Sequence, residues 1–399
     1  MAPVRLSLPA AAEVDALLGA LAADHTVART PAVTVRRGVL DTFDWRLHGA
    51  GLVLERERVG RRAELVLRSL DGDEVVRVPS AALPTFVDDL PDGPLRAHLE
   101  PVVEMRAIGP VAELVTERVT ARVEDDEGKT RVRVVVERNR LAEGRGGGAA
   151  LGAVLTVVPL RGYEPDARRV ADLFAVGADA SPAGTDPAPA GTDPVLAAFD
   201  ALGLEPGWYS SKLRVPLDPS MAAADAVRRV LVALRQTMRD NEAGMLADVD
   251  SEFLHDYRVA VRRTRSVLGQ AKGVLPPALL AWAVPEWKWL GTITSPTRDL
   301  DVWLLTLPEL EVSVPPLLEG GLARLHEHIG ALQREAHDTL VAELGSPRAH
   351  ELFARWDAWL GDADALLPEG PAEGPAEGDA AAAPQAGAPV VDVARQRIW

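Results

Sequence analysis

The period of the hydrophobic pattern changes once along this chain, and that change most constrains the fold. Up to about residue 160, β-branched residues and leucine alternate with charged residues, as in TRVRVVVERNRL at 130–141. This period-two pattern predicts strands with one wet face, which are usual in antiparallel sheets and barrels. From about residue 219 the period becomes 3.6, which predicts helices. We therefore expect an α+β chain of two domains: an N-terminal antiparallel β barrel with helices, then an all-α helical bundle.

The length of 399 residues agrees with two domains, each large enough to bury a core. The expected strands are 33–42, 51–59, 63–70, 74–79, 117–124, 130–141 and 152–160, with helices at about 10–23 and 165–176. The expected helices of the second half are 219–245, 251–272, 285–293, 296–306, 315–344 and 347–367.

Two stretches have the composition of loops. The Pro/Gly/Ala/Thr-rich residues 178–194 repeat AGTDP and predict a flexible loop. Residues 195–204 read as a helix that folds back on the first domain, so we place the boundary near 212–218, giving domains 1–212 and 216–399. The low-complexity segment 369–389 cannot bury enough apolar surface to fold and is expected to be disordered, before a short helical pattern that runs to Trp399.

Composition narrows the function classes. The formal net charge of -16 opposes general binding of nucleic acid or anionic membranes, so an anion site would have to be local. Cysteine is absent, which excludes disulfides, thiolate metal sites and cysteine nucleophiles. We find no signal peptide and no apolar run near the ~20 residues of a membrane span, and expect a cytoplasmic protein.

The stretch HDYRVAVRRTRS, residues 255–266, concentrates basic residues in this acidic chain. On a helix it forms a basic stripe, which we define as His255, Arg258, Arg262 and Arg265, beside an apolar face of Tyr257, Val261 and Leu268. Like charges at these spacings repel by roughly 0.2–0.5 kcal/mol per pair, so the stripe needs carboxylate partners or a ligand. The preceding helix carries a second set on one face, which antiparallel packing could bring beside the stripe: Arg228, Arg235 and Arg239.

Two interpretations of the stripe remain open. It is either a solvated face neutralised by nearby acids such as Asp256, or a groove that binds a polyanion through planar guanidinium groups. A second constellation lies in WKWLGTITSPTRDLDVWLL at 287–305, where Arg298 and Asp301 are three residues apart. There a structural Arg–Asp pair is favoured over direct ligand contact.

At these residues the chain resembles the CHAD family, the conserved histidine α-helical domains. The hallmark motif is matched by His255, Arg258-Val259, Arg262-Arg263 and Arg265-Ser266, and the match continues into Trp287, Leu290 and Arg298-Asp299-Leu300-Asp301-Val302. The resemblance covers about 216–399 and implies a helical bundle with a basic groove that binds inorganic polyphosphate, without catalysis. The family has two similar halves, and this chain ends where the second would begin, so we expect an incomplete domain.

The resemblance makes inorganic polyphosphate the expected partner, with no cofactor and no metal, and targeting to polyphosphate granules as an extension. The residues expected to bind it are His255, Arg258, Arg262, Arg263, Arg265, Arg298, Arg228, Arg235 and Arg239.

The first domain resembles the CYTH family, whose fold is a triphosphate tunnel. The match rests on LDTFDWRLHGAGLVLERER and on SKL at 211–213. Active members hold a divalent metal and a triphosphate with N-terminal glutamates and a lysine, whereas this chain has VRLSLP there and its first lysine is Lys129. Glu55 and Glu57 replace the usual arginines and are interpreted as a polar strand face, not a relocated metal site. We therefore expect a degenerate, tunnel-like docking module.

Two alternatives stay open beside polyphosphate binding. One is a metal-dependent triphosphatase or adenylate-cyclase-like CYTH enzyme, which the absent glutamates disfavour. The other is a nucleic-acid-binding module, which the acidic net charge and the lack of aromatic residues within the stripe disfavour. Two weaker motifs have simpler interpretations. A solvated helix face accounts for His326, His328 and His337, and a hairpin turn accounts for GRGGGAALG at 144–152.

Overall fold

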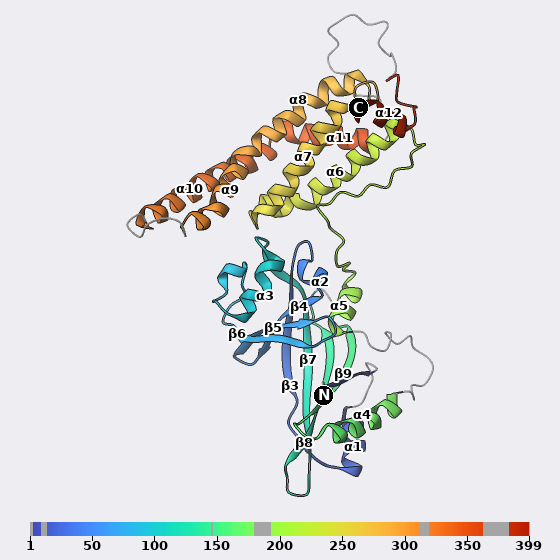
Figure 1. Cartoon of the computed structure of the whole chain (residues 1–399), viewed down its shortest axis with the longest axis vertical. Helices are drawn as coiled ribbons and strands as arrows, with labels where there is room; N and C mark the ends of the chain where they lie inside the picture. The colour runs from blue at the N-terminus through green and yellow to red at the C-terminus, as the bar shows by residue number, and fades with distance from the viewer. Residues whose placement is uncertain are drawn as a thin grey trace, which may run out of the picture. The chain divides into compact units, whose positions relative to one another are not determined.

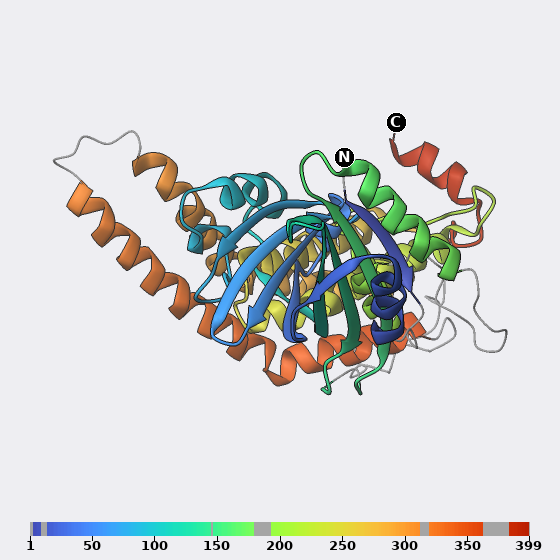
Figure 2. The same cartoon turned by 90° about the horizontal axis from the view of Figure 1, so that it is seen from below.

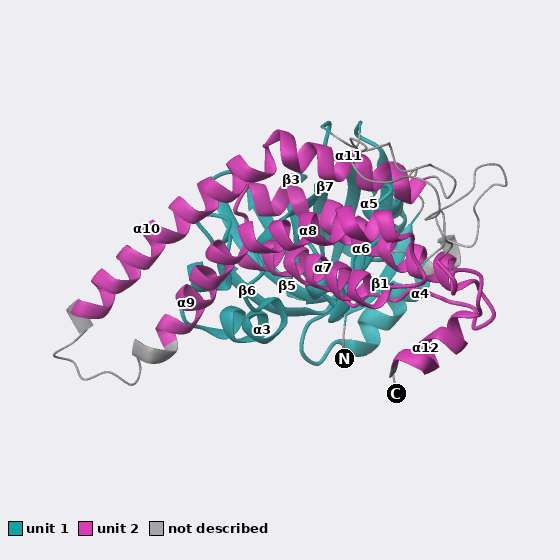
Figure 3. Ribbon diagram, turned by 90° about the horizontal axis from the view of Figure 1, so that it is seen from above, with its two compact units in different colours: residues 1–209 teal, residues 210–399 magenta. Residues whose placement is uncertain are grey.

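The computed structural model describes residues 3–8, 14–144, 147–178, 193–311, 319–361 and 383–398. The chain divides into two compact units, residues 1–209 and 210–399 (Figures 1 and 3). Of the loop expected at 178–194, residues 179–192 lie outside the described residues. No described helix combines the length and apolar character needed to cross a bilayer.

The first unit is built on one curled antiparallel sheet with the order β1-β9-β8-β7-β3-β4-β5-β6, and β2 pairs with β7 (Figure 2). Its strands are β1 (Val4–Leu8), β2 (Thr26–Arg29), β3 (Val33–Thr42), β4 (Leu52–Val59), β5 (Arg62–Ser69), β6 (Glu74–Pro79), β7 (Ile108–Glu124), β8 (Thr130–Leu141) and β9 (Ala150–Pro159). The helices are α1 (Val14–Asp24), α2 (Arg46–Gly49), α3 (Pro94–Val103), α4 (Glu164–Ala178) and α5 (Pro194–Leu202), with the short 3-10 helix η1 (Val87–Asp89).

The expected antiparallel sheet is confirmed, but three parts of it were not predicted: β1, β2 and the first half of β7. VRLSL is only five residues long, and it becomes a strand through pairing with β9, where Leu6 lies opposite Leu155. Strand β2 likewise depends on its pairing with the far end of β7. Both strands pair with residues far along the chain, Val4 with Val157 and Thr26 with Glu124, and a local period cannot reveal such partners.

Alternation along the strands gives the sheet two different faces. On the outer face, Leu54, Leu65 and Leu67 pack with residues of α2 and α3, while a second apolar cluster joins β7, β8 and β9 to α1 and α4. On the concave face, helix α5 fills one part through Val195, Ala198 and Phe199, which pack against strand residues such as Val39 and Leu114. The remainder of the concave face is polar, and it is described below.

The turn after β3 is organised by a buried carboxylate. Asp41 accepts hydrogen bonds from the backbone amides of Thr42 (2.7 Å), Leu47 (3.0 Å) and His48 (3.0 Å), which secures the start of α2. Burial raises the pKa of Asp41 to about 6, although these amides favour the carboxylate. The folded protein therefore holds this proton at pH values where the unfolded chain has released it.

That pKa predicts a specific pH dependence. Between about pH 4 and about pH 6, the contribution of Asp41 to the free energy of unfolding should fall as pH rises, because the folded state must give up a proton that the unfolded state no longer carries. Urea unfolding at pH 4, 5 and 6, compared with Asp41→Asn, isolates this contribution from other titrations. Parallel profiles for the two proteins would contradict the prediction.

The second unit is helical, as expected. Its helices are α6 (Ala223–Leu246), α7 (Ser251–Gln270), α8 (Pro277–Ile293), α9 (Ser295–Glu311), α10 (Glu319–Leu344), α11 (Pro347–Gly361) and α12 (Val390–Ile398). Helices α6 and α7 form an antiparallel pair joined by a short turn, and α9 pairs with α10 (Figure 1). Helix α8 begins at Pro277, eight residues before the predicted start, because Leu279 and Ala283 are buried and extend the core-facing side past Pro285.

The segment expected to be disordered, 369–389, is described only from residue 383. There the structure differs from the expectation, because residues 383–389 make backbone hydrogen bonds to the helical unit. The amide of Gln385 donates to the carbonyl of Gly273 (2.8 Å), and that of Ala224 donates to the carbonyl of Ala386 (3.0 Å). Alanine-rich composition did not predict this order, since the stabilising partners come from α6 and from the turn after α7.

Candidate functional site

Helix α7 presents the basic stripe as its sequence period predicts. Tyr257, Val261 and Leu268 are buried, which confirms the predicted apolar face. Asp250 caps the helix, its carboxylate accepting hydrogen bonds from the amides of Glu252 (2.9 Å) and Phe253 (3.2 Å). Along the other side His255 and Arg258 are half-buried, whereas Arg262, Arg263 and Arg265 are exposed. The packing of α7 thus turns the C-terminal half of the motif to solvent.

Arg258 is held against the junction of α8 and α9. Its Nη1 donates hydrogen bonds to the hydroxyls of Thr294 (2.8 Å) and Ser295 (3.1 Å), and lies 3.4 Å from the carbonyl of Gly291. Burial lowers the pKa of Arg258 from its ordinary value, Asp299 opposes that effect, and the neighbouring cations Arg298 and Arg262 add to it. The structure therefore brings Arg298 into the electrostatic neighbourhood of the stripe.

Arg298 is itself tied to the start of α7. Its Nη1 donates to the carbonyl of Ser251 (3.2 Å), and its Nη2 lies 3.8 Å from a carboxylate oxygen of Glu252. The partner that sequence spacing suggested, Asp301, is instead held by Gln333, whose Nε2 donates to Oδ1 at 3.1 Å. Burial raises the pKa of Asp301 above its ordinary value, with Asp248 acting in the same direction.

The arginines of α6 have different neighbours from the stripe. Arg235 is buried and forms a bidentate interaction with Asp357 of α11 at 2.9 and 3.2 Å, with its guanidinium 4.2 Å from the ring centre of Phe353. Arg239 also pairs with Asp357 (2.8 Å), and Arg228 donates to the carbonyl of Leu360 at 2.8 Å. All three arginines of α6 therefore interact with residues of α11.

The exposed end of the stripe lines a surface pocket with α8. The pocket has a volume of about 350 Å³ and is lined by Arg262, Arg265, Ser266, Leu268, Val284 and Lys288. Gly291 leaves room for Arg265, because a Cβ placed there would come 2.9 Å from its Nη1. Lys288 is the one cation here that the sequence did not single out, although it stands in WKWL beside buried Trp287. The sequence signal that could have identified Lys288 is its position directly after Trp287, a buried residue of the core.

The exposed arginines of α7 lack acidic partners. Arg263 donates to the carbonyl of Ser211 at 3.4 Å, while Arg262 and Arg265 make no side-chain hydrogen bond to any described residue. None of the three forms an ion pair with a carboxylate in the described part of the chain. Asp256, the acid proposed to neutralise the stripe, is buried, and the nearby Asp250 caps the helix.

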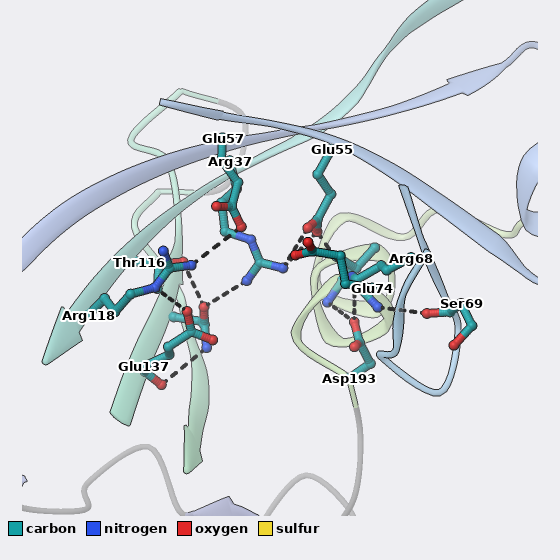
Figure 4. A network of polar contacts seen from close by, with 12 residues as sticks. Arg37, Glu55, Glu57, Arg68, Ser69, Glu74, Thr116, Arg118, Glu137 and Asp193 are labelled. Atoms are coloured by element: carbon teal, nitrogen blue, oxygen red, sulfur yellow. Dashed lines mark hydrogen bonds and ion pairs between the residues drawn. The ribbon is translucent and has the colours of Figure 1, made fainter. Parts of the chain in front are cut away.

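The concave face of the first unit holds a network of ion pairs, shown in Figure 4. Arg37 donates to both oxygens of Glu55 at 2.7 and 2.9 Å, and Arg68 lies 3.4 Å from Glu55 and 2.8 Å from Asp193. A second group joins Arg118 to Glu137 at 2.6 Å and to Glu57 at 3.4 Å. Burial alone would raise the pKa of Glu55, but Arg37 and Arg68 hold it below its ordinary value.

Glu55 and Glu57 share one polar strand face, as predicted. That face is the concave side of the sheet, where Glu55 is only 1% exposed. Each carboxylate neutralises arginines that would otherwise be available to an anion. Among the described residues no three acidic or histidine side chains are grouped as metal ligands. His337, one of the three histidines considered as metal ligands from the sequence, forms a hydrogen bond between its Nε2 and the carbonyl of Met245 (2.9 Å).

The helical unit is similar to proteins of one known family. Residues 229–399 match the CHAD domain family. The crystal structure of the CHAD domain from the plant Ricinus communis is 30% identical, with a TM-score of 0.32, over 37% of this chain and 50% of that one. This chain therefore spans about half of that protein's length. No curated protein matches the chain.

The first unit is similar to other solved structures. A protein from Pyrococcus horikoshii is 15% identical over 43% of this chain and 86% of that one, with a TM-score of 0.25. An inorganic triphosphatase is 13% identical over 51% of this chain and 95% of that one, with a TM-score of 0.20. The family that residues 229–399 match is the one whose motif lies on α7.

Proposed function

We propose that this protein binds inorganic polyphosphate, without catalysis, through the exposed side of α7. The observation that carries the proposal is that Arg262, Arg263 and Arg265 are exposed and have no carboxylate partner among the described residues. Cations without carboxylate partners attract anions, so these arginines would stabilise a bound polyanion even in a protein of acidic net charge. The CHAD match of residues 229–399 supports the same reading.

The proposed site contains His255, Arg258, Arg262, Arg263 and Arg265 with Lys288 added from α8. Guanidinium groups suit phosphate oxygens because they donate two parallel hydrogen bonds and stay charged near neutral pH. Arg258 and Arg298 have hydroxyl and carbonyl partners that orient them, so they contribute charge beside the exposed cations. The α6 arginines are proposed to stabilise the bundle instead, since Asp357 and Leu360 engage them. Recruitment to polyphosphate granules would follow from such binding.

A triphosphatase is less well supported. Its chemistry requires carboxylates free to hold a metal and cations free to neutralise phosphate. On the concave face Glu55 is bound to two arginines, and Glu57 pairs with Arg77 at 3.0 Å and Arg118 at 3.4 Å. We propose that this unit is a docking or scaffolding module.

Titration of the full chain with long-chain polyphosphate at two salt concentrations tests the proposal. Log K should fall with log salt by about 0.7 per neutralised phosphate, by analogy with single-stranded nucleic acids. Arg262→Glu should weaken binding at least tenfold and flatten the salt dependence, because it removes one contact and adds a repulsive charge.

Arg324→Glu is the matched control, since Arg324 is an exposed arginine of α10 that lines no part of the proposed site. It makes the same change of charge and should leave the affinity nearly unchanged. Equal loss in both variants would show a response to net charge only, and no binding by the well-folded protein would overturn the proposal.

A further inference from the structure

Strand β4 sends its glutamates and its arginines to opposite faces of the sheet. Glu55 and Glu57 point to the concave side, so the intervening Arg56 and the following Arg58 lie on the outer face. Arg36 of β3 is directly opposite Arg58 in the register, and Gly38 is opposite Arg56. Three arginines therefore meet on the outer face, away from the ion-pair network of the concave side.

These arginines line the outer-face pocket, which we define by Arg36, Arg56, Arg58 and Glu113 together with apolar residues that include Leu83 and Val111. Its volume is about 410 Å³, within the range of small-molecule sites. Three guanidinium groups and a single carboxylate leave a formal charge of +2. Gly38 forms part of the lining without a side chain, and open space lies where its Cβ would be.

The donors in this pocket are largely unused. Arg36 lies 3.5 Å from Glu113, and Nη2 of Arg56 donates to the carbonyl of Ala81 at 3.3 Å. Nε of Arg56 is buried without a hydrogen-bond partner, and Arg58 has no side-chain partner within the described ranges. Like charges directly opposite on neighbouring strands destabilise a sheet. The Arg36–Arg58 pairing is therefore unfavourable by itself, solvent and Glu113 reduce the repulsion, and an anion bound between the two arginines would remove it.

We propose that the outer-face pocket binds the phosphate group of a small organic phosphate with an apolar body. A phosphate monoester carries a charge of about -1.5 to -2 near neutral pH, which balances the three arginines and Glu113. Its oxygens accept the paired donors of guanidinium groups. The apolar residues of the lining would contact the rest of the molecule, so inorganic phosphate alone fills the site incompletely.

Phenyl phosphate is the simplest probe, because it joins a phosphate to an apolar ring. In a titration of the full chain followed by ³¹P NMR, phenyl phosphate should bind more tightly than inorganic phosphate, and phenol should not compete with it. Arg58→Gln should weaken phenyl phosphate binding at least fivefold. The variant is expected to fold normally, since it relieves the repulsion with Arg36.

Two further variants make the result specific. Arg61→Gln removes an exposed arginine of the neighbouring β4–β5 turn that lines no part of the pocket, and it should bind phenyl phosphate as the wild type does. Arg262→Glu should also bind it normally, which separates this pocket from the proposed polyphosphate site. Absence of binding by the wild type, or equal binding by Arg58→Gln, overturns the inference, as does loss of binding in Arg61→Gln.

Discussion

Glu55→Gln is expected to lower the free energy of unfolding of the first unit by about 3–5 kcal/mol, the cost of breaking a buried ion pair on one side. Glu55 is 1% exposed and neutralises two arginines, Arg37 and Arg68, which are 6% and 5% exposed. The amide keeps the size of the side chain but removes its charge. The Arg37 guanidinium would then lie buried without its carboxylate partner, whereas Arg68 would keep Asp193 at 2.8 Å.

Urea unfolding followed by tryptophan fluorescence measures this effect, because Trp45 is buried in the first unit. Glu64→Gln is the control: Glu64 pairs with Arg77 at 2.8 Å, but its side chain is 44% exposed. Solvent screens that pair, so the control should cost no more than about 1 kcal/mol. Equal effects of the two substitutions would show that the concave network is more hydrated than its geometry indicates.

Asp357→Ala is expected to destabilise the helical unit by about 2–3 kcal/mol without weakening polyphosphate binding. Asp357 is the common partner of Arg235 and Arg239, and Arg235 is 6% exposed. Losing the carboxylate leaves a buried guanidinium that retains only its stacking on Phe353. The value is reduced from that of a fully buried pair because the Asp357 side chain is 27% exposed.

Arg239→Gln is the matched control, since the Arg239 side chain is 48% exposed and its loss leaves the Arg235–Asp357 interaction intact. Thermal and urea unfolding should show little change for it. Polyphosphate titration of both variants then distinguishes a role of the α6 arginines in stability from a role in binding. Unchanged affinity is expected if these arginines only stabilise the helical unit. A marked loss of affinity in Arg239→Gln would instead place α6 in the binding site.

Much of the fold could be predicted from the local period of the hydrophobic pattern. The strands at 33–42 and 130–141 were predicted with their observed bounds, because the two faces of each strand have different surroundings and side chains alternate between them with a period of two. Helix α7 was predicted at 251–272 and observed at Ser251–Gln270, with its apolar face correctly assigned. The prediction failed for β1 and for the start of α8, where a distant pairing and a core contact extended elements whose local signal was weak.

By itself, the sequence determined that the chain changes from strands to helices and that four basic residues form one stripe on α7, because helix and strand periods are local properties of the backbone. Only the tertiary structure decided which cations remain free. Asp357 reaches Arg235 across 122 residues, and Glu55 reaches Arg37 between neighbouring strands, so neither pairing has a sequence signature. Availability of a charge depends on what packs against it, and that contact exists only once the chain has folded.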